Sequence, residues 1–113
     1  RPRADEQIWP AGVEQFIVPE HNGHLDLVLM MMQLGKRQIN SIWVEAGATL
    51  AGVLLQAGLV DELIVYVAPK LLGDDARGLC RLPGLETLAA APALKFSEVR
   101  QVGPDLCLHL THA

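Results

Sequence analysis

Two apolar runs separated by a run of small residues restrict the fold of this chain more than any other feature. Residues 38–46 (QINSIWVEA) carry large apolar side chains without regular polar alternation, which is typical of a strand buried on both faces. Residues 48–57 then place apolar side chains at helical spacing and stop at Gly58, which indicates a helix. Residues 61–70 form a second apolar run that ends at Pro69. A strand, a helix and a strand in this order favour parallel strands joined by a right-handed crossover.

The flanking segments extend this pattern in both directions. Residues 14–20 (EQFIVPE) are typical of a short strand, and residues 24–34 of a buried helix with Gly35 as its C-terminal cap. A loop and a short helical segment at residues 85–90 follow the strand of residues 61–70. The chain finishes with two alternating runs hinged at Gly103 and Pro104, which predict an antiparallel hairpin. We therefore expect an α/β fold with a mostly parallel sheet, flanking helices and an antiparallel C-terminal hairpin.

Composition limits the domain count and the classes of partner. The chain has 113 residues, 50% of them hydrophobic, so it fits a single domain with a real core. A formal net charge of -4 and the lack of a basic cluster argue against nucleic acid or an anionic membrane as the main partner. No apolar stretch is long enough to span a bilayer, and the two cysteines have no metal-binding spacing. We expect a cytoplasmic protein and, from its polar start without methionine, a piece of a longer chain.

A single carboxylate marks a candidate site. In SIWVEAGATLAG, Glu45 ends the first apolar run, and ligands of open parallel sheets bind outside the carboxyl ends of the strands. Gly47, Ala48 and Thr49 then open the helix, and the free N–H groups of such a helix start favour a phosphate. The alternative is that Glu45 only stabilises the helix N-terminus and Gly47 only permits a tight turn. The pattern leaves both readings open, and it is neither G-x-G-x-x-G nor a P-loop.

Two further groups of polar residues are weaker candidates. His21 and His24 are near carboxylates in the sequence, but three-residue spacing in a glycine-containing loop is more typical of solvated histidines than of a metal site. Residues 74–77 (DDAR) predict a charged loop after the strand of residues 61–70, with a lid role left open. We assign no metal site to this chain.

Several blocks also match a known family. The segment INSIWVEAGATLAGVLLQAGLVDELIVYVAPKLLG resembles the C-terminal reductase domain of the RibD-type bifunctional deaminase/reductases of riboflavin biosynthesis, especially the enterobacterial members. DARGL, LPGLE and VGPDLCLHL follow in the same order, so the resemblance covers essentially the whole chain. It implies a dihydrofolate-reductase-like fold and the NADPH-dependent reduction of 5-amino-6-(5-phosphoribosylamino)uracil to the ribitylamino compound.

The resemblance also implies which residues bind ligands. Glu45 corresponds to a glutamate that contacts the substrate, and no catalytic residue is assigned. Cofactor binding is implied for the turn and helix start, namely Gly47, Ala48, Thr49, Leu50, Ala51, Gly52 and Val53. Many relatives have two glycines after the glutamate where this chain has Ala46 and Gly47. No basic group of the sequence can be placed at a 2′-phosphate, so the pattern does not distinguish NADPH from NADH.

The domain organisation follows from the same resemblance. Residues 1–113 correspond to the C-terminal portion of the reductase domain, without its N-terminal part. The deaminase domain is absent because no H-x-E followed by P-C-x-x-C occurs, and zinc is expected only in that domain. We expect a small phosphoribosylaminopyrimidine substrate and a homodimer. The alternatives are a dihydrofolate or pteridine reductase, and a non-catalytic dimer-forming module.

Overall fold

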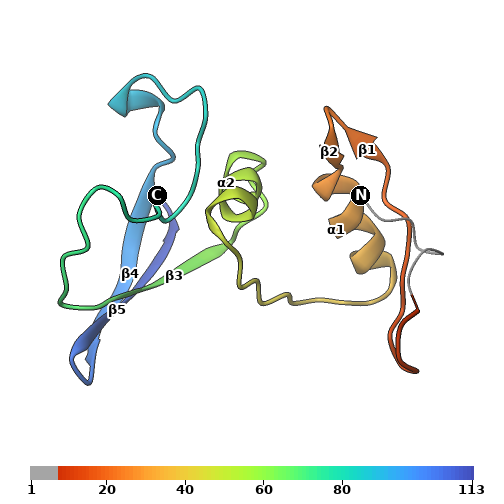
Figure 1. Ribbon diagram of the computed structural model, residues 1–113, viewed down its shortest axis with the longest axis horizontal. Coiled ribbons are helices and arrows are strands. Elements are labelled where there is room, and N and C mark those ends of the chain that lie inside the picture. The colour runs from red at the N-terminus through yellow and green to blue at the C-terminus, as the bar shows by residue number, and fades with distance from the viewer. Residues whose placement is uncertain (1–7) are drawn as a thin grey trace. The chain divides into compact units, whose positions relative to one another are not determined.

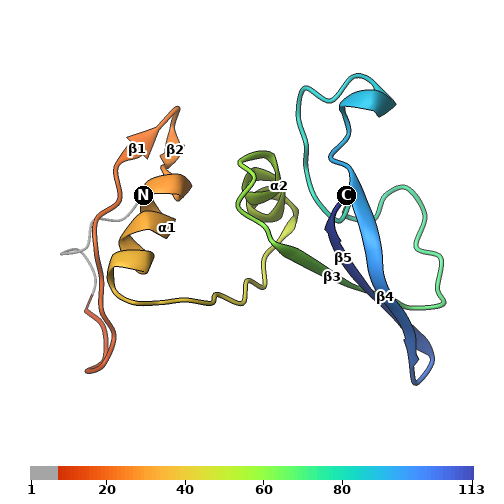
Figure 2. The same ribbon diagram turned by 180° about the vertical axis from the view of Figure 1, so that it is seen from behind.

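The computed structural model describes residues 8–113, and the polar opening of the chain, residues 1–7, lies outside the described residues. The chain divides into two compact units, with the boundary between Trp43 and Val44. Figure 1 and Figure 2 show the elements of each unit from opposite sides.

The first unit begins with a minimal β-hairpin. Strand β1 (Glu20–His21) pairs antiparallel with β2 (His24–Leu25). The two turn residues, Asn22 and Gly23, have φ angles of 52° and 82°. Asparagine followed by glycine is the pair that tolerates this left-handed conformation, which explains the tight two-residue turn of this hairpin.

Helix α1 (Leu27–Lys36) follows directly, so the predicted helix is present but begins three residues later than expected, because His24 and Leu25 belong to β2. The expectation that this helix is buried is wrong, since none of its residues is buried. The side chain of Asp26 caps it by accepting a hydrogen bond of 3.0 Å from the N–H of Leu29. The expectation that Gly35 caps the C-terminus is wrong, because the helix continues through Gly35. Gln38 instead adopts the left-handed conformation, with a φ of 64°, and its N–H donates back to the Gly35 carbonyl at 3.0 Å.

The second unit contains helix α2 and a three-stranded sheet. Helix α2 (Ala48–Gln56) ends where predicted, at Gly58 with a φ of 70°. The sheet consists of β3 (Glu62–Val67), β4 (Leu94–Val102) and β5 (Asp105–His112) in the order β3-β5-β4. The predicted helical segment at residues 85–90 is only a 3₁₀ turn, η2 (Leu88–Ala90).

The C-terminal hairpin is confirmed, and the parallel sheet is not observed. Strands β4 and β5 meet at the two-residue turn of Gly103 and Pro104, and every strand pair in the described residues is antiparallel. Residues 14–19 and 39–47 are not assigned to strands. A strand needs a neighbour for its ladder hydrogen bonds, and β5 occupies the central position between β3 and β4. The apolar pattern therefore identified β3 as a strand, and the neighbour observed for it is the antiparallel strand β5.

The sheet core is centred on Cys107. This side chain has an exposed fraction of 0%, and it lies on β5 directly opposite Tyr66 of β3. The hydrogen bond with the Cys107 thiol raises the pKa of Tyr66 above its ordinary value. Large apolar side chains elsewhere in the sheet remain exposed, including Tyr66 at 59% and Phe96 at 62%.

Candidate functional site

The N-terminus of α2 is open. Its N-cap, Gly47, has an extended backbone with φ −73° and ψ 176° and makes no side-chain capping bond. The first helical bond joins the N–H of Ala51 to the Gly47 carbonyl at 3.1 Å, so the preceding N–H groups have no partner within the helix. Helix α1 differs, because Asp26 caps it with a carboxylate. The start of α2 therefore presents free donors and the positive end of the helix dipole.

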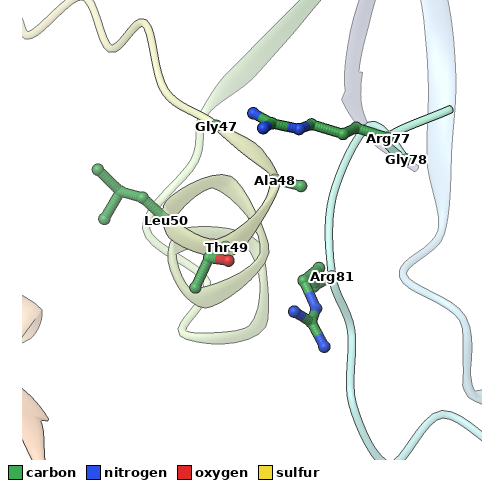
Figure 3. A pocket seen from close by; sticks show the side chains of 7 residues that line it. All are labelled: Gly47, Ala48, Thr49, Leu50, Arg77, Gly78 and Arg81. Carbon is green, nitrogen blue, oxygen red and sulfur yellow. The ribbon is translucent and has the colours of Figure 1, made fainter.

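A cavity of about 680 Å³ lies against this open helix start. Figure 3 shows its lining, which comes from the first turn of α2 and from the loop between β3 and β4. The lining residues are Gly47, Ala48, Thr49, Leu50, Arg77, Gly78 and Arg81. All of them belong to the second unit. The lining holds two guanidinium groups, one hydroxyl and no carboxylate, which suits an anionic ligand.

The loop that carries the arginines is fixed to one face of α2. The backbone N–H of Arg81 donates to the Ala48 carbonyl at 2.9 Å. One turn later, a Cβ built on Gly52 would lie 1.8 Å from the Arg81 carbonyl oxygen, so only glycine allows this approach. A further turn along, Gln56 donates its side-chain amide to the Pro83 carbonyl at 3.1 Å. Positions 48, 52 and 56 share one helix face and together hold the loop beside the cavity.

The structure brings part of the predicted cofactor segment to the cavity. Gly47, Ala48, Thr49 and Leu50 line it, whereas Ala51, Gly52 and Val53 do not. Gly52 is buried beneath the Arg81 backbone, so its contact in this structure is with the loop.

Glu45 lies just before this helix start. It precedes the N-cap by two residues, is exposed, and is not part of the cavity lining. The neighbouring Ala46 does not have a positive φ, so the chain passes this point without a glycine-specific conformation. An alanine therefore fits this position without strain.

The sequence missed the loop side of the cavity. Arg77 was placed in a charged loop, and neither Gly78 nor Arg81 was singled out. A weak signal existed, since two of the nine basic residues stand four positions apart around a glycine. Their place beside α2 depends on a tertiary contact at Gly52 that no local pattern reveals.

Other binding classes receive no support from the part of the chain described. Within residues 8–113, no three His, Cys, Asp or Glu side chains are grouped closely enough to hold a metal ion. His21 and His24 pair across the small hairpin of β1 and β2. No helix in residues 8–113 has the length and apolar content needed to cross a bilayer.

The family model and the most similar known proteins indicate the same family. A family model described as the RibD C-terminal domain matches residues 3–108. The chain is 72% identical over its whole length to the riboflavin biosynthesis protein RibD of Escherichia coli, covering 31% of that protein. It is 40% identical over 98% of its length to a 5-amino-6-(5-phosphoribosylamino)uracil reductase of Buchnera aphidicola, of which it covers 54%.

A solved structure agrees with the sequence comparison. The chain resembles Acinetobacter baumannii RibD, form 2, with a TM-score of 0.70 and 35% sequence identity. The match covers 80% of this chain and 27% of that one. The chain therefore spans only about a third of the Escherichia coli RibD protein and about half of the Buchnera reductase.

Proposed function

The chain belongs to the RibD C-terminal domain family, and from this premise we propose that it forms the C-terminal part of a reductase domain. The reaction that we propose is the NADPH-dependent reduction of the ribosyl group of 5-amino-6-(5-phosphoribosylamino)uracil to the ribitylamino compound. The observation that carries the proposal is the match over residues 3–108 to a family whose members include a named reductase of this compound.

The cavity at α2 is the cofactor site in this proposal. The N–H groups of Ala48 and Thr49 donate hydrogen bonds to the pyrophosphate of the dinucleotide, since the open helix start supplies free donors and a favourable dipole. The Thr49 hydroxyl adds a further donor. NADPH when bound supplies the hydride, and the residues of this chain supply position and charge.

Glu45 is the substrate residue in this proposal. Its position two residues before the N-cap of α2 places it next to the cofactor site along the chain. A carboxylate there accepts hydrogen bonds from the substrate and fixes its orientation relative to the nicotinamide. This role needs no unusual backbone, in keeping with the ordinary φ of Ala46.

The domain organisation is also a proposal. We assign residues 1–113 to the C-terminal portion of a reductase domain in a longer cytoplasmic deaminase/reductase that forms a homodimer. The exposed apolar side chains of the sheet, such as Phe96 at 62%, are consistent with burial by further parts of the enzyme. Residues 39–47 are not assigned to a strand, and they have the composition of a buried parallel strand. In the complete domain we expect it to gain neighbours and give a dihydrofolate-reductase-like sheet.

Turnover by the complete enzyme tests the proposed function. Oxidation of NADPH is followed by absorbance with the phosphoribosylaminouracil as substrate, and the ribitylamino product is identified by mass. Dihydrofolate serves as the control substrate, because a pteridine reductase is the main alternative. Turnover with the pyrimidine and none with dihydrofolate is the expected result. The reverse preference would refute the proposal.

A further inference from the structure

Strand β4 forms an open edge of the three-stranded sheet. In residues 8–113 it pairs with β5 on one side and with no strand on the other, and residues 95–102 are all exposed. The strand that we expect from residues 39–47 is joined to β3 through α2, and β5 already occupies one side of β3. This strand would therefore pair on the other side of β3, which leaves the edge of β4 open.

The backbone of β4 directs alternate residues toward this edge. Val102 and Asp105 flank the two-residue turn between β4 and β5, and residues that flank such a turn exchange backbone hydrogen bonds. Bonding to the neighbouring strand then alternates along an antiparallel strand. Arg100 therefore bonds to β5, whereas Gln101 and Val99 present their N–H and C=O groups to the open edge.

The charges along this edge are self-complementary. Glu98 and Arg100 flank Val99 and share one face of the sheet, with the Arg100 Nε 3.4 Å from a carboxylate oxygen of Glu98 and each side chain 53% exposed. If two copies of β4 pair antiparallel about Val99, Glu98 of each copy lies opposite Arg100 of the other. Opposite charges in such positions stabilise a strand pair, and like charges destabilise it. A shift by two residues would place Glu98 opposite Glu98 or Arg100 opposite Arg100, so the charges select one register.

The same register satisfies the backbone and covers apolar surface. Val99 of one copy faces Val99 of the other, and because both direct their backbone groups outward, they form a hydrogen-bonded pair. Val99 and Phe96 lie on the face opposite to the charges, since they stand beside Leu108 and Leu110 of β5. Their side chains are 54% and 62% exposed. Pairing therefore packs Val99 against its counterpart, next to the exposed ring of Phe96.

We propose that the edge of β4 is a homodimer interface, in which two copies of this chain pair antiparallel about Val99 and form one continuous sheet. The inference rests on the homodimer of the proposed function and is independent of the proposed reaction. Charged side chains and bulges commonly protect a sheet edge from pairing. Here the irregularity lies between Phe96 and Glu98, to one side of Val99, and the charges attract in one register. They restrict the edge to a partner with the complementary order of charges, which a second copy provides.

Charge reversal tests this interface, with the molar mass of the complete enzyme measured by analytical ultracentrifugation. Glu98→Arg and Arg100→Glu each place like charges opposite each other twice in the dimer, and each is expected to weaken dimerisation by about tenfold or more. The double variant Glu98→Arg/Arg100→Glu brings opposite charges together again and is expected to restore the dimer. Lys95→Glu is the matched control, because Lys95 is on the same strand but beyond the bulge from Val99. Its reversal should change the dissociation constant by less than about twofold.

A cross-link tests the register. The two-fold symmetry places position 99 opposite itself, with Cα atoms about 5.5 Å apart, a distance that a disulfide spans. Val99→Cys is therefore expected to give a covalent dimer on mild oxidation. Gln101→Cys is the control and should give none, because its counterpart lies four residues along the pairing strand, at about 13 Å.

The outcomes separate the interface from the proposed homodimer. A monomeric wild-type enzyme would overturn both, whatever its turnover. A wild-type dimer that persists unchanged in both folded single variants would overturn only the interface, as would a double variant that dissociates like the single ones. Cross-linking through Gln101→Cys and not through Val99→Cys would overturn the register. Thermal melting of each variant confirms folding, and turnover by the wild-type enzyme tests the proposed reaction independently.

Discussion

At the residue scale, Gly47 and Gly52 of the same helix have opposite surroundings. A Cβ at Gly47 would meet no atom within 4 Å, and the φ of −73° there is open to any residue. A Cβ at Gly52 would collide with the Arg81 backbone. Packing therefore requires glycine at position 52 but not at position 47. Because Gly47 has no side chain, a ligand in the cavity can approach the backbone closely.

A pair of substitutions at the helix start tests this view. Gly47→Val is expected to fold normally and to weaken NADPH binding by roughly a hundredfold or more, because the branched side chain keeps the pyrophosphate from several N–H groups at once. Thr49→Ala removes a single hydroxyl donor and should weaken binding by less, about tenfold. NADPH titration of both variants in the complete enzyme measures the difference. Undiminished affinity in a folded Gly47→Val protein would place the pyrophosphate elsewhere.

Replacing Glu45, the carboxylate before α2, with its isosteric amide tests its role in substrate binding. Glu45→Gln in the complete enzyme is expected to lower turnover by roughly ten- to a hundredfold, as the loss of a charged hydrogen bond to the substrate predicts. Stability should change little, because Glu45 is exposed. NADPH affinity is the internal control and should stay near the wild-type value. Wild-type turnover in this variant would remove Glu45 from the site.

At the element scale, local patterns predicted helices and the hairpin well. The spacing of apolar residues located α1 and α2, and Gly103 with Pro104 located the turn between β4 and β5. These features are set by neighbouring residues. The end of α1 was misplaced because Gln38, a residue with a side chain, adopts the left-handed conformation that glycine favours.

Local sequence patterns could not predict which strands pair or which loop residues line the cavity. A strand of apolar residues on both faces pairs with whichever strand lies beside it, so the sequence of β3 identified a strand without identifying β5 as its antiparallel neighbour. Arg77 and Arg81 reach the cavity only because the loop packs on α2 at Gly52. The sequence therefore predicted the part of the candidate site at the start of α2. It did not predict the part on the loop, which depends on tertiary packing.

A substitution that adds one methyl group to α2 tests the contact between this helix and the loop. Gly52→Ala is expected to lower stability by about 1–3 kcal/mol, the usual cost of forcing an atom into a filled space. It should also weaken NADPH binding, since the displaced loop carries both arginines. Gly35→Ala is the matched control, because Gly35 is helical with open space around its Cβ. That substitution should raise stability by about 0.4–1 kcal/mol. Chemical unfolding of both variants gives the comparison, and equal effects would contradict the close contact at Gly52.

At the scale of the whole molecule, the described residues bury few side chains. Within residues 8–113, Leu54 and Cys107 are the only buried hydrophobic residues, whereas Trp43 and Ile17 are exposed by 72% and 76%. Apolar side chains in such numbers on a surface normally meet another part of a protein. This surface agrees with the coverage of the relatives, of which the chain spans 31% in the Escherichia coli protein.

The isolated chain provides the last test, because it contains the proposed cofactor turn without the remaining surface of the reductase domain. Purified residues 1–113 are expected to show no turnover of the phosphoribosylaminouracil with NADPH, since residues 39–47, which include Glu45, are not assigned to a strand that would fix the position of this carboxylate. Self-association is expected as well, because the exposed apolar side chains and the edges of the sheet favour contact with a second copy. Analytical ultracentrifugation measures the association, and the complete enzyme assayed in parallel is the positive control. Turnover by the isolated chain would show that these residues hold the whole catalytic apparatus, and it would refute our assignment of them to only the C-terminal portion of the domain.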